Sequence, residues 1–373
     1  MKRNSIAYLL CLIICVYAFN SNSKRPLAEQ KQKTGNRFGI EEESFGAWIN
    51  PAGDPIGGGT SYSRIITHGD YHVSSREELL DALKKAKPGQ IVYVDDNTAI
   101  DLTGMKNIEI PGGITLASGR NGESVKGALI YSIQLDTTPL FATGGDNVRI
   151  TGIRLRGPDQ ERRTEQLEEL SAEGGREAYY RISYSDGIQS THSDLEVDNC
   201  ELWGWSHAAV SLKKGATKAH IHHNYIHHNQ RYGLGYGVCL DQSDALIEAN
   251  LFDWCRHHIA GTGSPGTSYE ACYNIVFENA NGHSFDMHGG RDRDDGTEIA
   301  GDLIKIHHNL FLAIDVTAVV IRGIPTQKAE IHHNWFLHPT PEKAIRQGAW
   351  SAPITGNMEV YRNQYTESRI IKD

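Results

Sequence analysis

The sequence predicts an all-β protein built as a parallel β-solenoid. Three observations lead to this fold class: a short motif recurs at intervals of 24 to 31 residues, strand-type alternation of apolar and polar residues fills the intervals, and amphipathic helix patterns are rare within them. Such a period with short β-type segments is typical of parallel β-solenoids. Because one coil cannot bury its apolar face alone, the coils must stack into a continuous core.

The recurring motif consists of an apolar residue, two variable residues, Asn, one further residue and a large apolar residue. Clear copies occupy residues 221–226, 247–252, 306–311, 331–336 and 360–365, and looser copies occupy residues 197–202 and 275–280. The fourth position recurs at intervals of 24, 26, 28, 31, 25 and 29 residues. Asn tolerates a left-handed backbone and bonds nearby backbone groups, so we expect the Asn of each copy to form the bend of one coil.

The N-terminal end of the chain has the pattern of a secretory signal peptide. Lys2 and Arg3 precede an uncharged apolar run of 14 residues from Ile6 to Phe19, which is short for a membrane-spanning helix. We therefore expect a signal peptide at residues 1–22, an arm or linker at 23–60 and the solenoid domain at 61–373. The mature protein is expected to be secreted or periplasmic, with no membrane span.

Four cysteines remain once the predicted signal peptide is removed, namely Cys200, Cys239, Cys255 and Cys272. An exported protein can form disulfides, and Cys255 with Cys272 is the candidate pair. Four buried free thiols in the coil stack are an equally open alternative.

A short helix is expected before the β region, at residues 74–89. Its sequence begins with Ser, carries Glu early and Lys late, and stops at Pro-Gly. A helix in this place would cover the open apolar end of the solenoid. Further along, residues 159–180 form a charged, partly helical insertion, which either lines a ligand site or is a solvated loop.

The order of elements resembles the pectate-lyase superfamily of right-handed parallel β-helices. The likeness runs through residues 74–89, 108–116, 147–155, 186–189, 195–202 and 210–224. It implies a right-handed single-stranded parallel β-helix with a short N-terminal capping helix, and a carbohydrate substrate. Pectate lyases commonly have acidic calcium ligands where His207, Ala208 and Ser211 stand here. Their arginine-proline catalytic signature has no counterpart after Asn229.

A second strand follows each motif copy, and these strands can be aligned by their apolar alternation. They occupy residues 209–213, 237–241, 258–262, 284–288, 318–322 and 344–348. If Val210, Val238 and Phe285 face inward, alternate residues must face outward. One outward column is then formed by Lys213, Asp241, Thr262, His288 and Arg322. The column beside it contains Asp286 and Arg346, and the next contains His258.

The cationic side chains around this face indicate an anionic ligand. They are Lys213, Arg231, Arg256, Arg291, Arg293, Arg322 and Arg346, with Tyr236 and Asp241 beside them. The chain as a whole has a formal charge of −9, which argues against general nucleic-acid binding. A planar guanidinium group holds a carboxylate or sulfate with two bonds. We expect a monomer that binds an acidic polysaccharide or oligosaccharide.

The chemistry that suits such a face is β-elimination at a uronate. A cation neutralises the carboxylate, a base removes the C5 proton, and the group on C4 departs. His288 and His258 are the candidate bases or acids. Arg291 and Arg322 are the candidate neutralisers, Asp286 would orient a neighbour, and Lys213 or Tyr236 is a reserve base. A sugar as leaving group would make the enzyme a lyase, and hydroxide from a terminal uronate would make it a dehydratase.

Two other function classes stay open. A β-helix glycoside hydrolase needs two carboxyl groups, and Asp241 with Asp286, two coils apart, would be separated by roughly 10 Å, at the far end of the inverting range. A carbohydrate-binding surface solenoid without chemistry is the non-enzymatic class.

Metal sites are not expected from the histidine pairs at 222–223, 227–228, 307–308 and 332–333. Adjacent strand residues point to opposite faces, so a pair should not chelate as a unit. We expect no cofactor, with calcium at the loop from Asp292 to Asp295 as the alternative.

Overall fold

The computed structural model describes residues 44–48, 50–51, 53–348 and 353–365. The predicted signal peptide and more than half of the predicted arm lie outside these described residues. Among the helices of the described segments, none is both long enough and apolar enough to cross a membrane.

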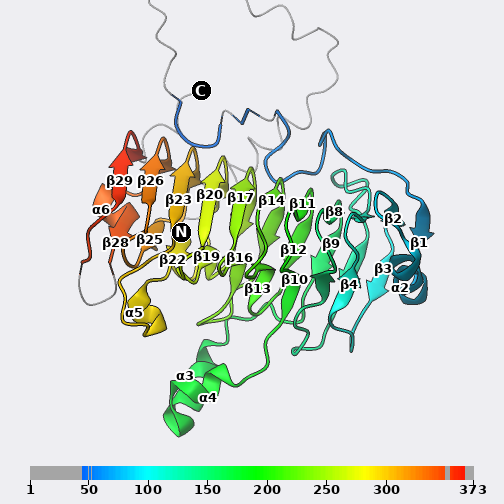
Figure 1. The fold of residues 1–373 in the computed structure, drawn as a ribbon, viewed down its shortest axis with the longest axis horizontal. Helices are drawn as coiled ribbons and strands as arrows, with labels where there is room; N and C mark the ends of the chain where they lie inside the picture. The colour runs from blue at the N-terminus through cyan, green and yellow to red at the C-terminus, as the bar shows by residue number, and fades with distance from the viewer. Residues whose placement is uncertain (1–43, 49, 52, 349–352, 366–373) are drawn as a thin grey trace, which may run out of the picture. The chain divides into compact units, whose positions relative to one another are not determined.

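Three all-parallel sheets make up the described chain (Figure 1). Sheet A contains β1 (Tyr71–Val73), β2 (Ile91–Val94), β5 (Thr115–Ala117), β8 (Arg149–Thr151), β11 (Glu196–Asp198), β14 (Ala219–His222), β17 (Asp244–Glu248), β20 (Ser268–Cys272), β23 (Leu303–His307), β26 (Lys328–His332) and β29 (Met358–Tyr361). Sheet B contains β3 (Ala99–Asp101), β6 (Leu129–Tyr131), β9 (Arg154–Arg156), β12 (Glu201–Trp203), β15 (Tyr225–His227), β18 (Leu251–Asp253), β21 (Ile275–Val276), β24 (Leu310–Phe311), β27 (Trp335–Phe336) and β30 (Gln364–Tyr365). Sheet C contains β4 (Ile108–Ile110), β7 (Phe141–Thr143), β10 (Asp186–Ser190), β13 (Ala208–Leu212), β16 (Tyr236–Leu240), β19 (His257–Gly261), β22 (Phe285–Met287), β25 (Val319–Ile321) and β28 (Ile345–Gln347).

Each coil adds one strand to sheet A, then one to sheet B, then one to sheet C. Sheet neighbours such as β5 and β8, or β7 and β10, are therefore three strands apart in the chain. The predicted fold is confirmed: the protein is a right-handed single-stranded parallel β-helix. Its three sheets fit the pectate-lyase-like architecture that the sequence resembles.

Inward side chains stack into one apolar core along the coils. In sheet C the inward position is taken by Val210, Val238, Ile259, Phe285 and Val319, all fully buried. These are the inward residues that the sequence alternation predicts. The side chains between them must face outward, and this alternation gives the candidate site its geometry.

The helices of the described chain are α2 (Arg76–Lys85), α3 (Thr164–Gly174), α4 (Arg176–Tyr180), α5 (Gly290–Arg293) and α6 (Pro341–Ala344). The predicted capping helix is α2, which lies at the β1 end of the stack (Figure 1). Ser75 caps it, and Glu78 completes a capping box. Leu79, Ala82 and Leu83 are buried in the common core, so α2 closes the apolar end of the solenoid.

The predicted charged insertion contains α3 and α4, which stand away from the sheets (Figure 1). Tyr179 of α4 is fully buried, and its Oη donates to the carbonyl of Tyr232 at 2.9 Å. The guanidinium of Arg231 lies 5.1 Å from the Tyr179 ring centroid and donates to the carbonyls of Ser183 and Ile182. Arg231 therefore anchors the insertion to the coils.

A ladder of Asn side chains, buried in all but the last coil, joins successive coils at the bend between sheets A and B. Its members are Asn224, Asn250, Asn274, Asn309, Asn334 and Asn363. From Asn250 onward, each Oδ1 accepts from the backbone N–H and the side chain of the preceding Asn, as Asn274 does from Asn250 at 3.0 Å. Each Nδ2 also donates to a carbonyl of the preceding coil, such as that of Ile247. The ladder fixes one coil on the next.

Two details of the predicted motif are wrong. The left-handed backbone lies at the residue before the ladder Asn, with φ of 53° at His223, 51° at Ala249 and 55° at Tyr273. The copy predicted at 275–280 is instead centred on Asn274. The interval from Asn274 to Asn309 is 35 residues, because this coil carries the long loop with α5. The average period of the motif does not reveal this longer coil.

The described part of the N-terminal arm runs along the Asn bends from the last coils toward the first (Figure 1). The N–H of Gly46 donates to the carbonyl of His333 at 2.9 Å, and that of Gly57 donates to the carbonyl of Ala249 at 2.8 Å. Gly59 N–H donates to Asn199 Oδ1 at 2.7 Å. This segment is thus part of the solenoid surface rather than a linker.

Replacing Asn274 by Ala should lower the free energy of unfolding by about 2–4 kcal/mol, because two donors of Asn250 and the carbonyl of Ile247 lose buried partners. Chemical denaturation measures this. Asn363→Ala is the matched control, since Asn363 is only half-buried and water can replace its bonds; its cost should be about 1 kcal/mol. Equal costs for the two variants would contradict a role for burial in the ladder.

Candidate functional site

The outward column predicted on sheet C is present. Strand pairing places Leu212, Leu240, Gly261, Met287 and Ile321 side by side in successive coils. The residues that follow them continue the column, and they are Lys213, Asp241, Thr262, His288 and Arg322. Thr262 Oγ1 donates to Asp241 Oδ1 at 2.8 Å, as neighbours in one column can.

Asp286 lies at the centre of this face with its side chain fully buried. Arg322 donates to both carboxylate oxygens, from Nε to Oδ1 at 2.8 Å and from Nη2 to Oδ2. The Nε2 atoms of His257 and His288 each lie 3.2 Å from Oδ2. Arg322 Nη1 also donates to Asp292 Oδ1 at 3.0 Å. We name these five residues the Asp286 cluster.

The charges of the Asp286 cluster fix the state of its carboxylate. Burial opposes the ionisation of Asp286, but interactions with His257, His288 and Arg322 outweigh it and hold the pKa of Asp286 well below its usual range. Asp286 therefore stays ionised and acts as a fixed anion. His288 is the member of the cluster best placed for a ligand, because 27% of its side chain is exposed.

A row of rings crosses the coils beside the Asp286 cluster. Its members, one per coil, are Tyr184, His207, Tyr236, His257 and His283, with neighbouring centroids 5.3 to 5.8 Å apart. Burial raises the pKa of Tyr236 to about 12 and lowers that of His283 to about 4. Tyr236 is therefore a neutral phenol, and His283 is a neutral imidazole, near neutral pH.

A second buried carboxylate lies under the same row. His207 Nδ1 is 2.5 Å from Asp186 Oδ1, and Thr138 Oγ1 donates to Asp186 Oδ2 at 2.7 Å. Burial opposes the ionisation of Asp186, but His207 and Thr138 hold its pKa below the usual value. Sheet C thus presents two imidazole and carboxylate pairs, with Tyr236 between their rings.

The prediction that His258 faces outward is wrong. His258 is fully buried, its ring lies 5.6 Å from that of Phe252, and neither ring nitrogen has a hydrogen-bond partner among the described residues. The N–H groups of His258 and Ile259 both donate to the carbonyl of Ser284, which interrupts the alternation as a β-bulge does. The residue that reaches Asp286 is therefore His257.

Three of the predicted ligand-binding arginines are engaged elsewhere. Arg231 is fully buried against backbone carbonyls, so its predicted place at the surface is wrong. Arg293 donates to the carbonyls of Thr262 and Ile299 and to Asp295. Arg291 is exposed but donates twice to Glu298.

Other predicted residues do lie together around the Asp286 cluster. Arg346 Nη2 is 3.2 Å from His283 Nε2, and burial together with Arg322 lowers the pKa of Arg346. The guanidinium of Arg256 lies 6.0 Å from the ring centroid of Tyr236. Lys213 is half-buried at the other end of the column.

Four residues of this face are not among the predicted site residues, namely Asp186, His207, His257 and His283. The signal that could have found the histidines is the recurrence of a Tyr or His ring at the same place in each coil. Because the bulge shifts this position by one residue relative to strict alternation, simple period-two counting misses it.

The histidine pairs have a geometry that strand alternation does not predict. His223, His228, His308 and His333 adopt left-handed φ values near 53°, which turns each ring toward its neighbour. The Nδ1 atoms of each pair then lie 2.7 to 2.9 Å apart, so one nitrogen donates and the other accepts. All four cysteines of the described chain are buried free thiols. The candidate pairing of Cys255 with Cys272 is therefore wrong, and the alternative of four buried free thiols is confirmed.

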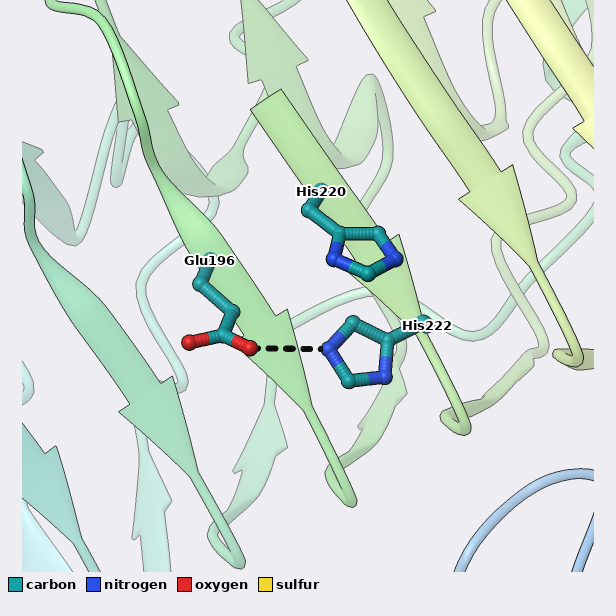
Figure 2. A group of neighbouring side chains, drawn as sticks. All are labelled: Glu196, His220 and His222. Atoms are coloured by element: carbon teal, nitrogen blue, oxygen red, sulfur yellow. Dashed lines mark hydrogen bonds and ion pairs between the residues drawn. The ribbon is translucent and has the colours of Figure 1, made fainter. Parts of the chain in front are cut away.

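Within the described residues, two groups of side chains gather as metal ligands do, and both lie on sheet A rather than in the Asp292 to Asp295 loop. One consists of Glu196, His220 and His222 (Figure 2). The other consists of Glu270, Cys272 and His307. In the loop proposed for calcium, Asp292 instead holds Arg322, and Asp295 holds Arg293.

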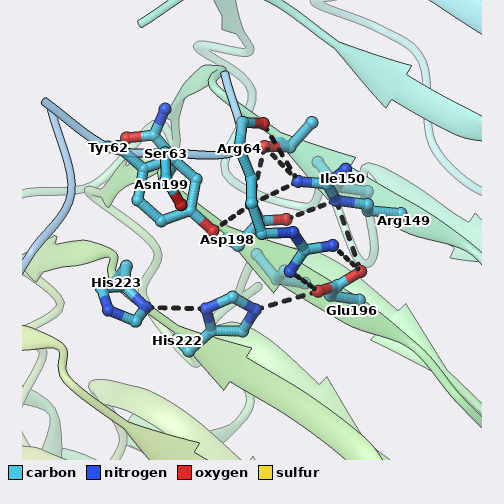
Figure 3. Close-up of polar contacts among 12 residues, drawn as sticks. Tyr62, Ser63, Arg64, Arg149, Ile150, Glu196, Asp198, Asn199, His222 and His223 are labelled. Carbon is cyan, nitrogen blue, oxygen red and sulfur yellow. Dashed lines mark hydrogen bonds and ion pairs between the residues drawn. The ribbon is translucent and has the colours of Figure 1, made fainter. Parts of the chain in front are cut away.

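The segment that directly follows the arm already occupies the first of these groups (Figure 3). Arg64 of this segment donates to both oxygens of Glu196, and Arg149 lies 3.3 Å from Glu196 Oε2. Nearby, Tyr62 Oη and Arg149 both donate to the buried carboxylate of Asp198. Glu196 therefore serves as an anchor for the segment that follows the arm.

A hollow of about 440 Å³ lies over the outer face of sheet A. Lys218, His220, Tyr269, Glu270 and Lys305 contribute to its lining. The hollow is thus separate from the Asp286 cluster, which is on sheet C. We place the candidate active site at the Asp286 cluster because the charged chemistry is concentrated there.

Comparison with known proteins returned neither a matching family model nor a matching curated protein. Sixteen solved chains match in structure. An alginate lyase from Paenibacillus sp. str. FPU-7 has 15% identity and a TM-score of 0.46, over 79% of this chain and 95% of its own. A family 28 exopolygalacturonase from Yersinia enterocolitica has 11% identity and a TM-score of 0.42, over 81% and 69%. A GH136 lacto-N-biosidase from Eubacterium ramulus has 12% identity and a TM-score of 0.34, over 74% and 49%. Similarity at this level transfers no site residue to this chain.

Acid should destabilise the fold through His258. Burial lowers the pKa of His258 to about 3, below its value of about 6.5 in the unfolded chain. The contribution of neutral His258 to the free energy of unfolding is therefore fully present above pH of about 6.5 and is lost as the pH falls toward 3. Between pH 6 and 4, His258→Leu should reduce the pH slope of the unfolding free energy by up to about 1.4 kcal/mol per pH unit. Denaturant titration at several pH values measures this, with exposed His68→Leu as control, and an unchanged slope in His258→Leu would contradict it.

Asp286→Asn should destabilise the protein by about 3–5 kcal/mol, because the buried guanidinium of Arg322 loses the anion that it contacts through two nitrogens and keeps only Asp292. Asp241→Asn, at a half-buried carboxylate in the neighbouring column, should cost about 1 kcal/mol or less. Equilibrium unfolding of the two variants tests this, and similar values would mean that Asp286 is not an essential counter-charge.

Proposed function

We propose that this protein is an exported enzyme that acts on uronic-acid-containing polysaccharide or oligosaccharide by β-elimination. It would be either a polysaccharide lyase or a dehydratase of a terminal uronate. The observation that most supports this is the Asp286 cluster, in which a buried anion holds two imidazoles and a guanidinium on an outer face of the solenoid.

His288 is the proposed base. If Nε2–H of His288 points to Asp286, Nδ1 carries the lone pair that can take the C5 proton of the sugar. Asp286 would fix this tautomer and stabilise the imidazolium that forms. The C5–H electrons then form the C4–C5 double bond, and the C4 oxygen leaves with its bonding pair.

The leaving oxygen needs a proton, and Tyr236 is the proposed donor. A pKa of about 12 keeps the phenol protonated, which favours an acid over the base suggested by the sequence. Tyr236 stacks on His257, whose Nε2 is 3.2 Å from Asp286, so the proposed acid lies one coil away from the Asp286 cluster.

Cations around the cluster would neutralise the uronate carboxylate. Arg322 is committed to Asp286 and Asp292, so this role is assigned to Arg346 and Arg256 instead. Lys213 lies further along the outward column, where a neighbouring sugar of the chain would pass. Neutralisation makes the C5 proton more acidic. The low acidity of this proton is otherwise the main barrier to elimination.

Hydrolysis is the second enzymatic candidate, and the state of Asp286 disfavours it. A hydrolase requires one carboxylic acid to protonate the leaving oxygen. Asp286 is buried, ionised and bonded to Arg322 through both oxygens, so it cannot supply that proton. Asp241 alone does not make a catalytic pair.

A panel of uronic-acid polysaccharides and their oligosaccharides should yield an unsaturated product that absorbs in the ultraviolet. His288→Ala should reduce kcat about 10²–10⁴-fold while thermal unfolding changes little. His72→Ala is the matched control. This exposed histidine lies on the far strand β1, and it also contacts an aspartate, at 2.9 Å. It should keep full activity.

The outcomes separate the function classes. Absorbance with new reducing ends indicates a lyase, and absorbance without them indicates a dehydratase. New reducing ends without absorbance would replace the proposal by hydrolysis. Binding without either product would make the protein a carbohydrate-binding solenoid, and full activity of His288→Ala would remove this residue from the mechanism.

A further inference from the structure

A second polar site lies on sheet A, away from the Asp286 cluster. Strand pairing places Glu248, Cys272 and His307 in one column of three successive coils. Glu270 is two residues before Cys272 on β20 and therefore shares its face. The possible ligand atoms of Glu270, Cys272 and His307 all lie within 4.8 Å of one another.

This set suits a rigid three-point site. Two ligands come from alternate residues of one strand, and the third comes from the paired strand. His307 Nε2 is 3.1 Å from Glu270 Oε1, and Cys272 Sγ is 3.9 Å from Glu248 Oε2. The strand pairing already holds these positions, so binding an ion would not require the backbone to rearrange.

The donor atoms favour zinc over calcium or magnesium. Thiolate, imidazole and carboxylate together are typical zinc ligands, whereas calcium and magnesium prefer oxygen alone. Cys272 is only 3% exposed, and burial with the charges of Glu248 and Glu270 raises the pKa of its thiol. A divalent cation would reverse this effect and displace the thiol proton.

The neighbouring histidine supplies the support that a metal-bound imidazole needs. A ligating histidine usually donates its other ring N–H to an acceptor, which fixes the ring. His307 Nδ1 is 2.9 Å from His308 Nδ1. When His307 Nδ1 donates to His308 Nδ1, His307 Nε2 keeps a lone pair for the ion.

The other metal-like group on this sheet is less suitable. Glu196 is held by Arg64 and Arg149, so an ion there would have to displace two guanidinium groups. Glu270 has only Lys305 as a cationic partner among the described residues apart from His307, at 3.4 Å.

We propose that Glu270, Cys272 and His307 form a zinc site on sheet A. Three protein ligands leave a fourth position for water or a small ligand. Glu270 also lines the hollow of about 440 Å³, so the site borders a space that such a ligand could enter. This inference does not depend on the proposed function, because the two sites lie on different sheets.

Cobalt titration of the whole protein tests the site, since Co²⁺ replaces Zn²⁺ and gives a thiolate-to-cobalt charge-transfer band only when cysteine is a ligand. The native protein should show this band, and added Zn²⁺ should remove it. Cys272→Ser should abolish the band, while Cys239→Ser, which changes a buried thiol on sheet C, should keep it.

Two further variants keep the test independent of the folding of Cys272→Ser. Glu270→Gln and His307→Gln should each weaken Co²⁺ binding about 100-fold, because each removes one ligand. No band in the native protein would overturn the proposal, as would a band that survives in Cys272→Ser or affinities unchanged in both other variants.

Discussion

The pairing of each coil with the next is the constraint on which the rest of this structure depends. Parallel strand pairing in three sheets sets the spacing of the coils, and the buried Asn ladder locks them at one bend. A slip of one residue would turn every inward side chain outward. Residues far apart in the sequence can therefore form a common surface only because this register is fixed.

The Asp286 cluster shows what that register makes possible. The side chains of His257, of Asp286 and His288, and of Arg322 come from three successive coils, yet they meet at one carboxylate. Removing a carboxylate from water is costly unless charged partners compensate. The compensation leaves an anion of fixed state and position beside a partly exposed imidazole, an arrangement suited to general base catalysis.

The sequence predicts the architecture well because the motif period and the alternation of apolar residues are both local signals. The outward column from Lys213 to Arg322 follows from alternation alone. His258 and His257 exchange places because a bulge, which depends on the pairing with Ser284, is not visible in the sequence. Arg231 is likewise misplaced, since its burial results from the insertion packing against it. Partners supplied by distant loops decide which charged residues are committed to structure, and periodicity does not reveal them.

The most direct measurement is a crystal structure of the protein with a non-cleavable uronic-acid oligosaccharide bound. The proposed mechanism requires the sugar to lie across β16, β19 and β22 on sheet C, with a C5 carbon about 3–3.5 Å from His288 Nδ1 and its carboxylate against Arg346 or Arg256. An oligosaccharide bound over the hollow of sheet A, or with its C5 carbons turned away from His288, would contradict the mechanism.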